Sequence, residues 1–369
     1  MSGLTVAVDY SAITRNAKAL LDQAGGAGLM AVVKADGYGH GLIETARAAR
    51  AGGASWLGVA QPDEALALRE GGDTGRILTW LYGPDVAAER LITADVDLSA
   101  SSLTVLEAIS AGAVRVGRRA RVHVCVDTGL GREGVTQEDL PALLEAVRRE
   151  HASGTIEAVG MWSHFAWADA PGHPTIDAQA GVFERALDLA GEMGLAFEVR
   201  HLANSAATLT RPELRYDLVR TGIALYGLPP VGDPSARIGL EPAMSVTSVV
   251  ALVKKVRAGQ GVSYGHEYVT DRETHLGLIP AGYADGVFRS AGGRAEVSIR
   301  GERYRIAGRV CMDQFVVDLG PSTSVTEGDV VTLIGPDGPT VRDWADAAGT
   351  IDYEIVCRFG GLRPKVVAG

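Results

Sequence analysis

The amino-acid sequence predicts an α/β protein in two parts: an N-terminal parallel (β/α)8 barrel of the TIM type and a C-terminal, mostly antiparallel β domain. In the first part, eight short apolar runs alternate with amphipathic helical segments. From Met244 onward, short segments alternate apolar and polar residues and are separated by glycine turns. The character changes near Pro229 and Pro230, and we place the domains at residues 1–235 and 236–369.

The eight apolar runs are the predicted strands of the barrel. They are Leu29–Val33, Trp56–Ala60, Arg76–Leu81, Val96–Leu98, Val122–Val126, Ile156–Met161, Val199–Leu202 and Leu218–Arg220. The clearest predicted helices are Asp9–Leu21, Leu42–Ala51, Asp63–Glu70, Leu140–Glu150 and Ile176–Met193. Leu140, Leu143, Leu144 and Val147 repeat at i, i+3, i+4 and i+7, which marks a buried helix face. An open doubly wound sheet is the alternative, but eight units rather than six favour the barrel.

The second part has the pattern of antiparallel strands joined by tight turns. The predicted strands are Val246–Val256, Thr274–Ile279, Ala295–Ile299, Phe315–Leu319 and Val330–Ile334. Only Val341–Ala348 has a helical pattern there. We therefore expect a small β domain with one helix.

Charge and composition exclude several classes of protein. A formal net charge of −10 argues against nucleic acid or an acidic membrane as partner, because both require a basic face. No stretch approaches the roughly 20 apolar residues of a membrane helix. Three widely spaced cysteines imply no disulfide framework and favour a reducing compartment, so we expect a cytoplasmic protein. The eight histidines lack H-x-H and H-E-x-x-H spacing, and we expect no metal site.

Polar residues follow several predicted barrel strands, whose carboxyl ends would face an active site. Lys34 ends the first strand before a glycine-rich turn, so a partly desolvated amine there could attack an aldehyde. Equally, Lys34 could extend into solvent ahead of an ordinary loop. Arg132 could hold a carboxylate through two parallel hydrogen bonds, although a surface arginine in a turn is the favoured interpretation of that residue alone.

The last three strands are followed by a histidine, a serine and an arginine. His164 by itself is more often structural than catalytic, and Asn204-Ser205 could simply begin a helix. The functional alternative is phosphate binding at that helix and at Arg220-Thr221-Gly222-Ile223, where barrels frequently hold phosphate. Each signal is modest alone, but their convergence on one barrel face is hard to explain by packing.

The second domain adds three short motifs, Ser263-Tyr264-Gly265, Gly282-Tyr283-Ala284-Asp285-Gly286 and Val310-Cys311-Met312-Asp313-Gln314. Each could be a turn beside a strand, and both tyrosines could equally be interface aromatics. Read together, the segments AVVKADGYGHG, DTGLGR, SHFAWAD, LANSAATL, RTGIALYGL, VSYG, GYADG and VCMDQ occur in the order found in the alanine racemase family. The chain resembles that family from about Val8 to Arg358. The resemblance implies a pyridoxal 5′-phosphate enzyme that acts as a head-to-tail homodimer, each site completed by the partner's β domain.

The resemblance also implies roles for individual residues. Lys34 would bind the cofactor covalently and act as one acid or base, and Tyr264 of the partner subunit would act on the opposite face. Arg220 would face the pyridine nitrogen, and His164 would link Tyr264 to Arg220. The phosphate would be bound by Tyr38, Ser205, Gly222, Ile223 and Tyr353.

For the substrate, the resemblance implies that Arg132 and the Met312 backbone would hold the carboxylate. Tyr283, Asp313 and Cys311 would shape the pocket and its opening. Racemisation needs a base on each face of a planar carbanion, and reference pKa values of about 10.4 for lysine and about 10 for tyrosine must both be lowered for use near neutral pH.

The chain departs from the family at Cys125, where many members have a lysine, often carbamylated. The negative charge of that group orients the arginine that Arg132 matches. A bound chloride or a Cys125 thiolate could supply that charge. A plain buried cysteine is at least as good an interpretation.

Three other functions compete with racemisation of alanine. A related barrel-type decarboxylase of a diamino acid would share the lysine but lack the tyrosine base, and the VSYG and CMD segments favour the racemase. The polar motifs of the extra β domain argue against a non-catalytic cofactor-binding barrel. Racemisation of serine or another small amino acid stays open. With alanine as substrate, the expected role is to supply D-alanine for peptidoglycan.

Overall fold

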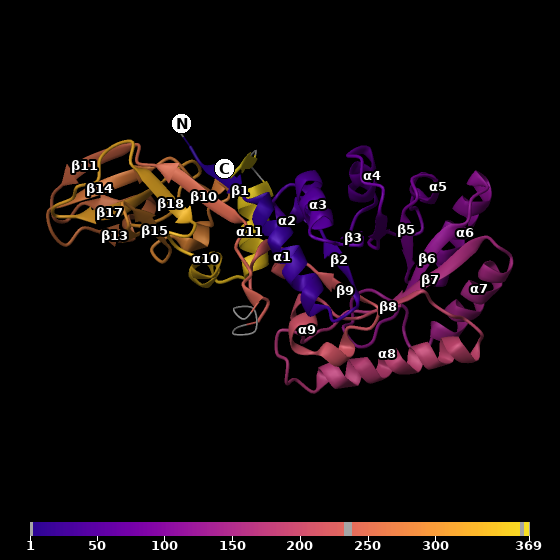
Figure 1. The fold of residues 1–369 in the computed structure, drawn as a ribbon. Helices are drawn as coiled ribbons and strands as arrows, with labels where there is room; N and C mark the ends of the chain where they lie inside the picture. The colour runs from indigo at the N-terminus through magenta and orange to yellow at the C-terminus, as the bar shows by residue number, and fades with distance from the viewer. Residues whose placement is uncertain (1–2, 232–237, 362–364, 369) are drawn as a thin grey trace. The chain divides into compact units, whose positions relative to one another are not determined.

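The computed structural model describes residues 3–231, 238–361 and 365–368. The chain divides into two compact units, one formed by Ser11–Gly37 and Leu42–Pro242 and the other by Met1–Tyr10, Tyr38–Gly41 and Ala243–Gly369 (Figure 1). The predicted domain boundary between residues 235 and 236 lies outside the described residues.

The larger unit contains a parallel sheet that curls into a nearly closed barrel, as predicted. Its strands are β2 (Gly28–Val32), β3 (Trp56–Val59), β4 (Arg76–Thr79), β5 (Asp97–Ala100), β6 (Ala120–Cys125), β7 (Ile156–Trp162), β8 (Val199–His201) and β9 (Leu218–Thr221). They pair in the order β8-β7-β6-β5-β4-β3-β2-β9. The two end strands approach each other through a bridge between Asn204 and Arg220 and through the Asp217 N–H, which donates to the Arg200 carbonyl at 3.1 Å.

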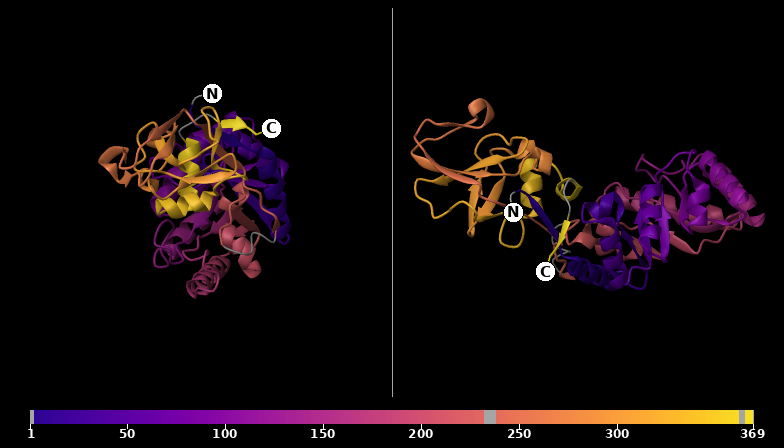
Figure 2. Two further views of the ribbon diagram at one scale, coloured as in Figure 1. Left: turned by 90° about the vertical axis from the view of Figure 1, so that its left-hand side faces the viewer. Right: turned by 90° about the horizontal axis from the view of Figure 1, so that it is seen from above.

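Helices flank these strands (Figures 1 and 2). They are α1 (Tyr10–Gln23), α3 (Leu42–Ala51), α4 (Pro62–Glu70), α5 (Ala88–Thr93), α6 (Leu103–Val116), α7 (Leu140–Ala152), α8 (Thr175–Glu192) and α9 (Ser205–Thr210). In α7 the predicted face of Leu140, Leu143, Leu144 and Val147 is buried. No helix of the described chain is both long enough and apolar enough to cross a membrane.

The smaller unit is built on two main sheets. A six-stranded sheet has the order β16-β15-β18-β10-β1-β19, and a three-stranded sheet has the order β11-β14-β17. Their strands are β1 (Thr5–Val8), β10 (Met244–Val249), β11 (Leu252–Val256), β14 (Thr274–Ile279), β15 (Glu296–Ile299), β16 (Glu302–Arg305), β17 (Phe315–Gly320), β18 (Val330–Ile334) and β19 (Lys365–Val367). A short hairpin joins β12 (Gly261–Val262) to β13 (Tyr268–Val269). The N-terminal strand β1 pairs antiparallel with β10 and parallel with β19.

Two predictions for this unit were wrong. The predicted strand Val246–Val256 is two strands, because the chain leaves one sheet after β10 and enters the other at β11. An unbroken apolar run, residues 249–253, spans the change of sheet, so the sequence pattern carries no sign of it. A second helix, α11 (Asp352–Gly361), follows the predicted helix α10 (Val341–Ala348). Its buried face of Ile355, Val356 and Phe359 is narrow, which is a weak helical signal.

Candidate active site

Lys34 stands at the start of a left-handed turn after β2. The segment Lys34–Tyr38, labelled α2, has φ angles of 53°, 53° and 52° at Ala35, Asp36 and Tyr38. A left-handed conformation costs roughly 1–2 kcal/mol for each residue that carries a Cβ. Strained backbone of this kind persists only where its surroundings enforce it, and it clusters at functional sites.

The carboxylate of Glu64 holds the start of this turn. Its Oε1 accepts the backbone N–H of Ala35 at 2.6 Å, while Oε2 accepts those of Ala60 and Gln61 at 3.1 and 2.9 Å. One side chain therefore caps α4 and fixes the backbone next to Lys34. The Lys34 Nζ lies 5.9 Å from the centre of the Trp80 ring.

Arg220, on β9, is only 5% exposed and connects to His164. Its Nη2 donates to the Ser163 carbonyl at 2.6 Å and contacts the His164 Nδ1 at 3.2 Å. Burial and the charges of Arg220, Arg132 and Lys34 hold the pKa of His164 well below its ordinary value, so the ring is neutral. Because arginine can only donate, the His164 Nδ1 accepts and the ring proton is on Nε2.

Ser205 and Gly222 meet at the ends of β8 and β9. The Ser205 Oγ accepts the N–H of Gly222 at 2.9 Å and that of Ala224 at 3.4 Å. Asn204 is the N-cap of α9, since its side chain accepts the Ala207 N–H at 3.1 Å. The predicted helix start is confirmed, and the Ser205 hydroxyl proton remains available to a ligand because both contacts use its oxygen as acceptor.

Arg132 has a carboxylate partner that we did not predict. Its Nε and Nη2 both donate to the side chain of Glu133, the second contact at 2.7 Å. Burial alone would raise the pKa of Glu133, but the hydrogen bond and charge of Arg132 hold it below its ordinary value. Burial, together with Glu133, raises the pKa of the Cys125 thiol well above its ordinary value, which favours the neutral thiol over the thiolate.

The candidate residues of the β domain lie on neighbouring loops. Ser263, which precedes Tyr264, has a φ of 62°, and its Oγ donates to the Arg309 carbonyl at 2.7 Å and lies 3.3 Å from the Cys311 Sγ. The Tyr283 N–H donates to the Cys311 carbonyl at 3.0 Å, so these two loops also touch. Tyr264 and Met312 are exposed, at 71% and 54%.

A close approach explains why Gly282 has no side chain. A Cβ there would lie 2.1 Å from the Met312 carbonyl oxygen. The Ala284 N–H donates to that oxygen at 2.9 Å, which fixes the backbone of Met312. Asp313, the next residue, is exposed.

Tyr38 and Tyr353 form a second pair within the smaller unit. Their ring centres are 6.0 Å apart. A Cβ on Gly39 would lie 2.5 Å from the Val356 carbonyl, so this glycine lets α11 approach the segment after Tyr38. Burial, with Tyr353 and Cys357, raises the pKa of Tyr38, which keeps its hydroxyl protonated.

Within each unit, several of the predicted site residues contact one another. Arg220 contacts His164, Ser205 contacts Gly222, and the loops of Tyr264, Tyr283 and Cys311 meet. Glu64 and Glu133 were missed. Two signals could have identified them: Glu64 comes three residues after the helix N-cap Gln61, and Glu133 is adjacent to a candidate arginine.

Known proteins resemble the chain over both of its parts. Residues 8–230 match the family model described as alanine racemase, N-terminal domain, and residues 243–367 match alanine racemase, C-terminal domain. A protein of Frankia casuarinae named alanine racemase is 55% identical over 364 residues, which are 97% of this chain and 94% of that protein. One of Salinispora arenicola with the same name is 52% identical over 361 residues, covering 97% and 96%.

Solved structures agree with this relationship. The alanine racemase of D-cycloserine-producing Streptomyces lavendulae superposes with a TM-score of 0.97 at 48% identity, covering 100% of this chain and 98% of that one. The alanine racemase of Streptomyces coelicolor gives a TM-score of 0.96 at 47% identity, covering 99% and 98%. The chain therefore belongs to the alanine racemase family and is an amino-acid racemase, an isomerase.

Proposed function

We propose that this chain interconverts L-alanine and D-alanine with pyridoxal 5′-phosphate. Lys34 and Tyr264 of the partner subunit serve as acid and base on opposite faces of the substrate. The observation that carries the proposal is the contact between the Arg220 Nη2 and the His164 Nδ1 at 3.2 Å, at the barrel edge where Lys34 follows β2 and Arg132 follows β6. The lowered pKa of His164, caused by burial and by these cations, supports it. Cations beside a neutral histidine suit the carboxylate of an amino acid and a phosphate-bearing cofactor.

The residues present fit this cofactor. Lys34 offers an amine at the end of β2, and Ser205 offers a hydroxyl proton to a phosphate oxygen beside the backbone of Gly222 and Ile223. Arg220 retains one donor, Nε–H, for which no described residue is an acceptor, and this donor suits the ring nitrogen. When bound, the cofactor supplies an electron sink for the substrate's α-carbon.

The family resemblance also assigns Tyr38 and Tyr353 to the phosphate. The protonated hydroxyl of Tyr38 is a donor, which a phosphate requires. This part of the proposal rests on the family resemblance and on the protonation state of Tyr38.

Proton transfer on the tyrosine side would run through the His164–Arg220 contact. With its proton on Nε2, His164 can donate to the phenol oxygen of Tyr264 of the partner subunit. The cation of Arg220 behind it would stabilise the phenolate and so favour its use as a base. The high exposure of Tyr264, 71%, is consistent with its contributing to a second copy of the chain.

Arg132 would bind the substrate carboxylate with the Met312 backbone, while Tyr283, Asp313 and Cys311 shape the pocket. Glu133 would hold the Arg132 guanidinium in its binding orientation. A homodimer in the cytoplasm that supplies D-alanine for peptidoglycan is the biological setting that the family relationship supports.

The test is to incubate the purified protein with pyridoxal 5′-phosphate and separate L-amino acids in D2O. Loss of the α-proton is followed by NMR and appearance of the D-enantiomer by chiral chromatography. Exchange and racemisation of alanine above the other amino acids support the proposal. Faster reaction of serine would change the substrate, and release of carbon dioxide from lysine, ornithine or diaminopimelate would replace racemisation by decarboxylation.

A further inference from the structure

Four buried polar side chains, Asp97, His123, His201 and Arg220, form a hydrogen-bonded series inside the barrel. Asp97, His123 and His201 are each 0% exposed. The Asp97 Oδ2 lies 3.2 Å from the His123 Nε2, and the His123 Nδ1 lies 2.9 Å from the His201 Nε2. The His201 Nδ1 in turn lies 3.3 Å from the Arg220 Nη1. The series begins at the first residue of β5 and ends near the carboxyl end of β9.

The two ends of the series determine where every proton lies. Arginine has no acceptor, so the His201 Nδ1 must accept and its Nε2 must carry the proton. The His123 Nδ1 then accepts from His201, and the His123 Nε2–H donates to the carboxylate of Asp97. The reversed series would place an N–H of His201 against an N–H of Arg220. Burial and the charge of Arg220 hold the pKa of His201 well below its ordinary value, in agreement with a neutral ring.

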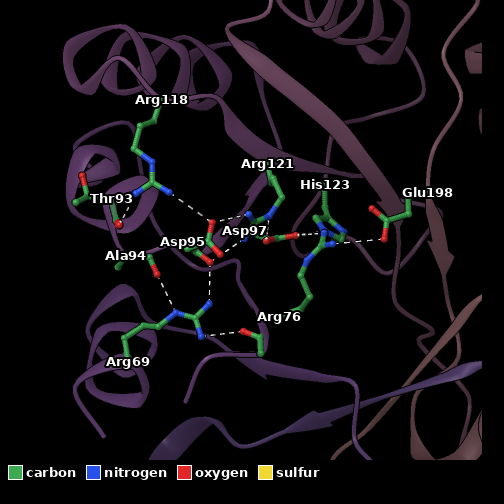
Figure 3. Close-up of polar contacts among 11 residues, drawn as sticks. Arg69, Arg76, Thr93, Ala94, Asp95, Asp97, Arg118, Arg121, His123 and Glu198 are labelled. Atoms are coloured by element: carbon green, nitrogen blue, oxygen red, sulfur yellow. Dashed lines mark hydrogen bonds and ion pairs between the residues drawn. The ribbon is translucent and has the colours of Figure 1, made fainter. Parts of the chain in front are cut away.

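The carboxylate of Asp97 is itself firmly held. It accepts from the Arg121 Nε at 2.6 Å and from the Arg76 Nη2 at 2.7 Å, and Figure 3 shows it between these arginines and His123. Burial alone would raise the pKa of Asp97, but the hydrogen bond from His123 and the charges of Arg121 and Arg76 lower it. A fixed anion at this end prevents reversal of the series.

Aromatic rings and a glycine position the two histidines. The His123 ring meets Trp56 edge-on at 5.3 Å, and the His201 ring stacks on Trp162 at 6.0 Å. A Cβ on Gly160 would lie 2.3 Å from the His123 Nδ1, so β7 leaves room for the imidazole only because this residue is glycine. The series is therefore fixed in geometry as well as in direction.

At Arg220 the protein provides acceptors for both Nη groups. Nη1 faces the Nδ1 and carbonyl of His201, the carbonyl at 2.7 Å, and Nη2 faces Ser163, Leu202 and His164. No described residue accepts from Nε. The guanidinium is thus oriented with one N–H free for a ligand.

We infer that Asp97, His123 and His201 are positioning residues that hold Arg220 so that its Nε–H meets the ring nitrogen of the cofactor. The inference rests on the proposed function, since it takes pyridoxal 5′-phosphate as the ligand. A buried ion pair alone is weak evidence for a stabilising role, whereas a one-directional series ending at a free donor specifies an orientation.

The test compares the affinity of the apoenzyme for pyridoxal 5′-phosphate with its affinity for the deaza analogue, whose ring nitrogen is replaced by C–H. Only the natural cofactor can accept from Arg220. A hydrogen bond from a cation predicts that the wild-type protein prefers the natural cofactor by about 10- to 100-fold. Dissociation constants are measured by titration and fluorescence, without turnover.

The variants are His123→Phe and Asp97→Asn, with Asp95→Asn as the matched control. Asp95 also accepts from Arg121, at 2.6 Å, but it is 54% exposed and has no contact with His123. We expect the preference to fall to about threefold or less in the first two variants. Asp95→Asn should keep the wild-type preference.

Unchanged affinity for the deaza analogue would show that a variant is folded, because misfolding weakens the binding of both ligands. A preference retained in both His123→Phe and Asp97→Asn would overturn the inference and leave the proposed function intact. Equal affinities of the wild-type protein for the two ligands would overturn the inference and also the proposed donation from Arg220 to the ring nitrogen. Absence of both racemisation and cofactor binding would refute the proposed function itself.

Discussion

Replacing Glu133 by glutamine tests whether this chain carries its own anion for orienting Arg132. The substitution keeps the size of the side chain and removes the charge that receives both Nε and Nη2 of Arg132. Arg132 has a side chain that is 58% exposed, against 18% for Glu133. Stability should change by no more than ~1 kcal/mol, because the Arg132 side of this ion pair is mostly exposed and such pairs contribute little.

The expected effect is on substrate binding. Without Glu133, the substrate carboxylate must order the Arg132 side chain when it binds, which costs about 0.5–1.5 kcal/mol for a long side chain. Since 1.4 kcal/mol corresponds to a factor of ten, KM for alanine should rise about 2- to 12-fold. The value of kcat should stay within about a factor of two, because Arg132 binds the substrate and the transition state alike.

The assay measures initial rates of D-alanine formation by chiral chromatography over a range of L-alanine concentrations. Glu150→Gln is the matched control, since Glu150 also pairs with the preceding residue, Arg149, at 3.2 Å. Each protein is assayed in chloride and in gluconate at equal ionic strength. The wild-type protein should be indifferent to chloride, and Glu133→Gln should regain affinity in chloride if the anion can take the vacated position.

A fall in KM would refute this reasoning, because it would mean that Glu133 competes with the substrate for Arg132. Chloride dependence of the wild-type protein would show that Glu133 does not supply the orienting charge. A similar rise in KM for Glu150→Gln would assign the effect to a general loss of surface charge.

Three further substitutions test features of the barrel unit. Glu64→Gln removes one acceptor from the Lys34 turn. It should destabilise the fold by about 1–3 kcal/mol in urea unfolding and lower kcat. Asp63→Asn, at an exposed neighbouring residue, should do neither, and equal effects of the two substitutions would contradict the role of Glu64 in holding the turn. Gly160→Ala should destabilise the fold by about 1–3 kcal/mol, because its Cβ would lie 2.3 Å from a histidine ring. The control, Gly181→Ala within α8, places a Cβ 3.5 Å from an arginine nitrogen and should stabilise the fold by about 0.5–1 kcal/mol. The lowered pKa of Asp97 means that its contribution to stability is complete above about pH 4 and lost as the pH falls through its folded-state pKa. Asp97→Asn should therefore melt below the wild type at neutral pH yet lose less on acidification, and parallel melting curves would disprove this.

The sequence predicted the barrel because its signals are local. Each of the eight strands is an apolar run with a helix beside it, and the periodicity of α7 from Leu140 alone identifies a buried face. Lys34, Arg220 and His164 could be singled out because the carboxyl ends of parallel strands share one edge of a barrel. These inferences need only the alternation of elements and one rule of topology.

The missed features depend on side-chain geometry across long sequence separations. Asp97, His123 and His201 lie within or beside apolar strands and resemble ordinary strand residues in the sequence. Their connection requires the strand register, which pairs Ser99 with His123 and Trp162 with His201. The strand β1 was missed because its partners lie more than two hundred residues away.

Pairing of β1 with β10 and β19 has a consequence for synthesis on the ribosome. The N-terminal strand emerges first, but β10 begins at Met244 and β19 at Lys365. At roughly 5–20 residues per second, β1 waits on the order of 10 to 50 seconds for its first partner. During that time it is an unpaired strand edge, the kind of element that recruits other chains. A chain interrupted after the barrel keeps this edge permanently, so isolated barrel fragments should remain soluble longer when they begin after Val8.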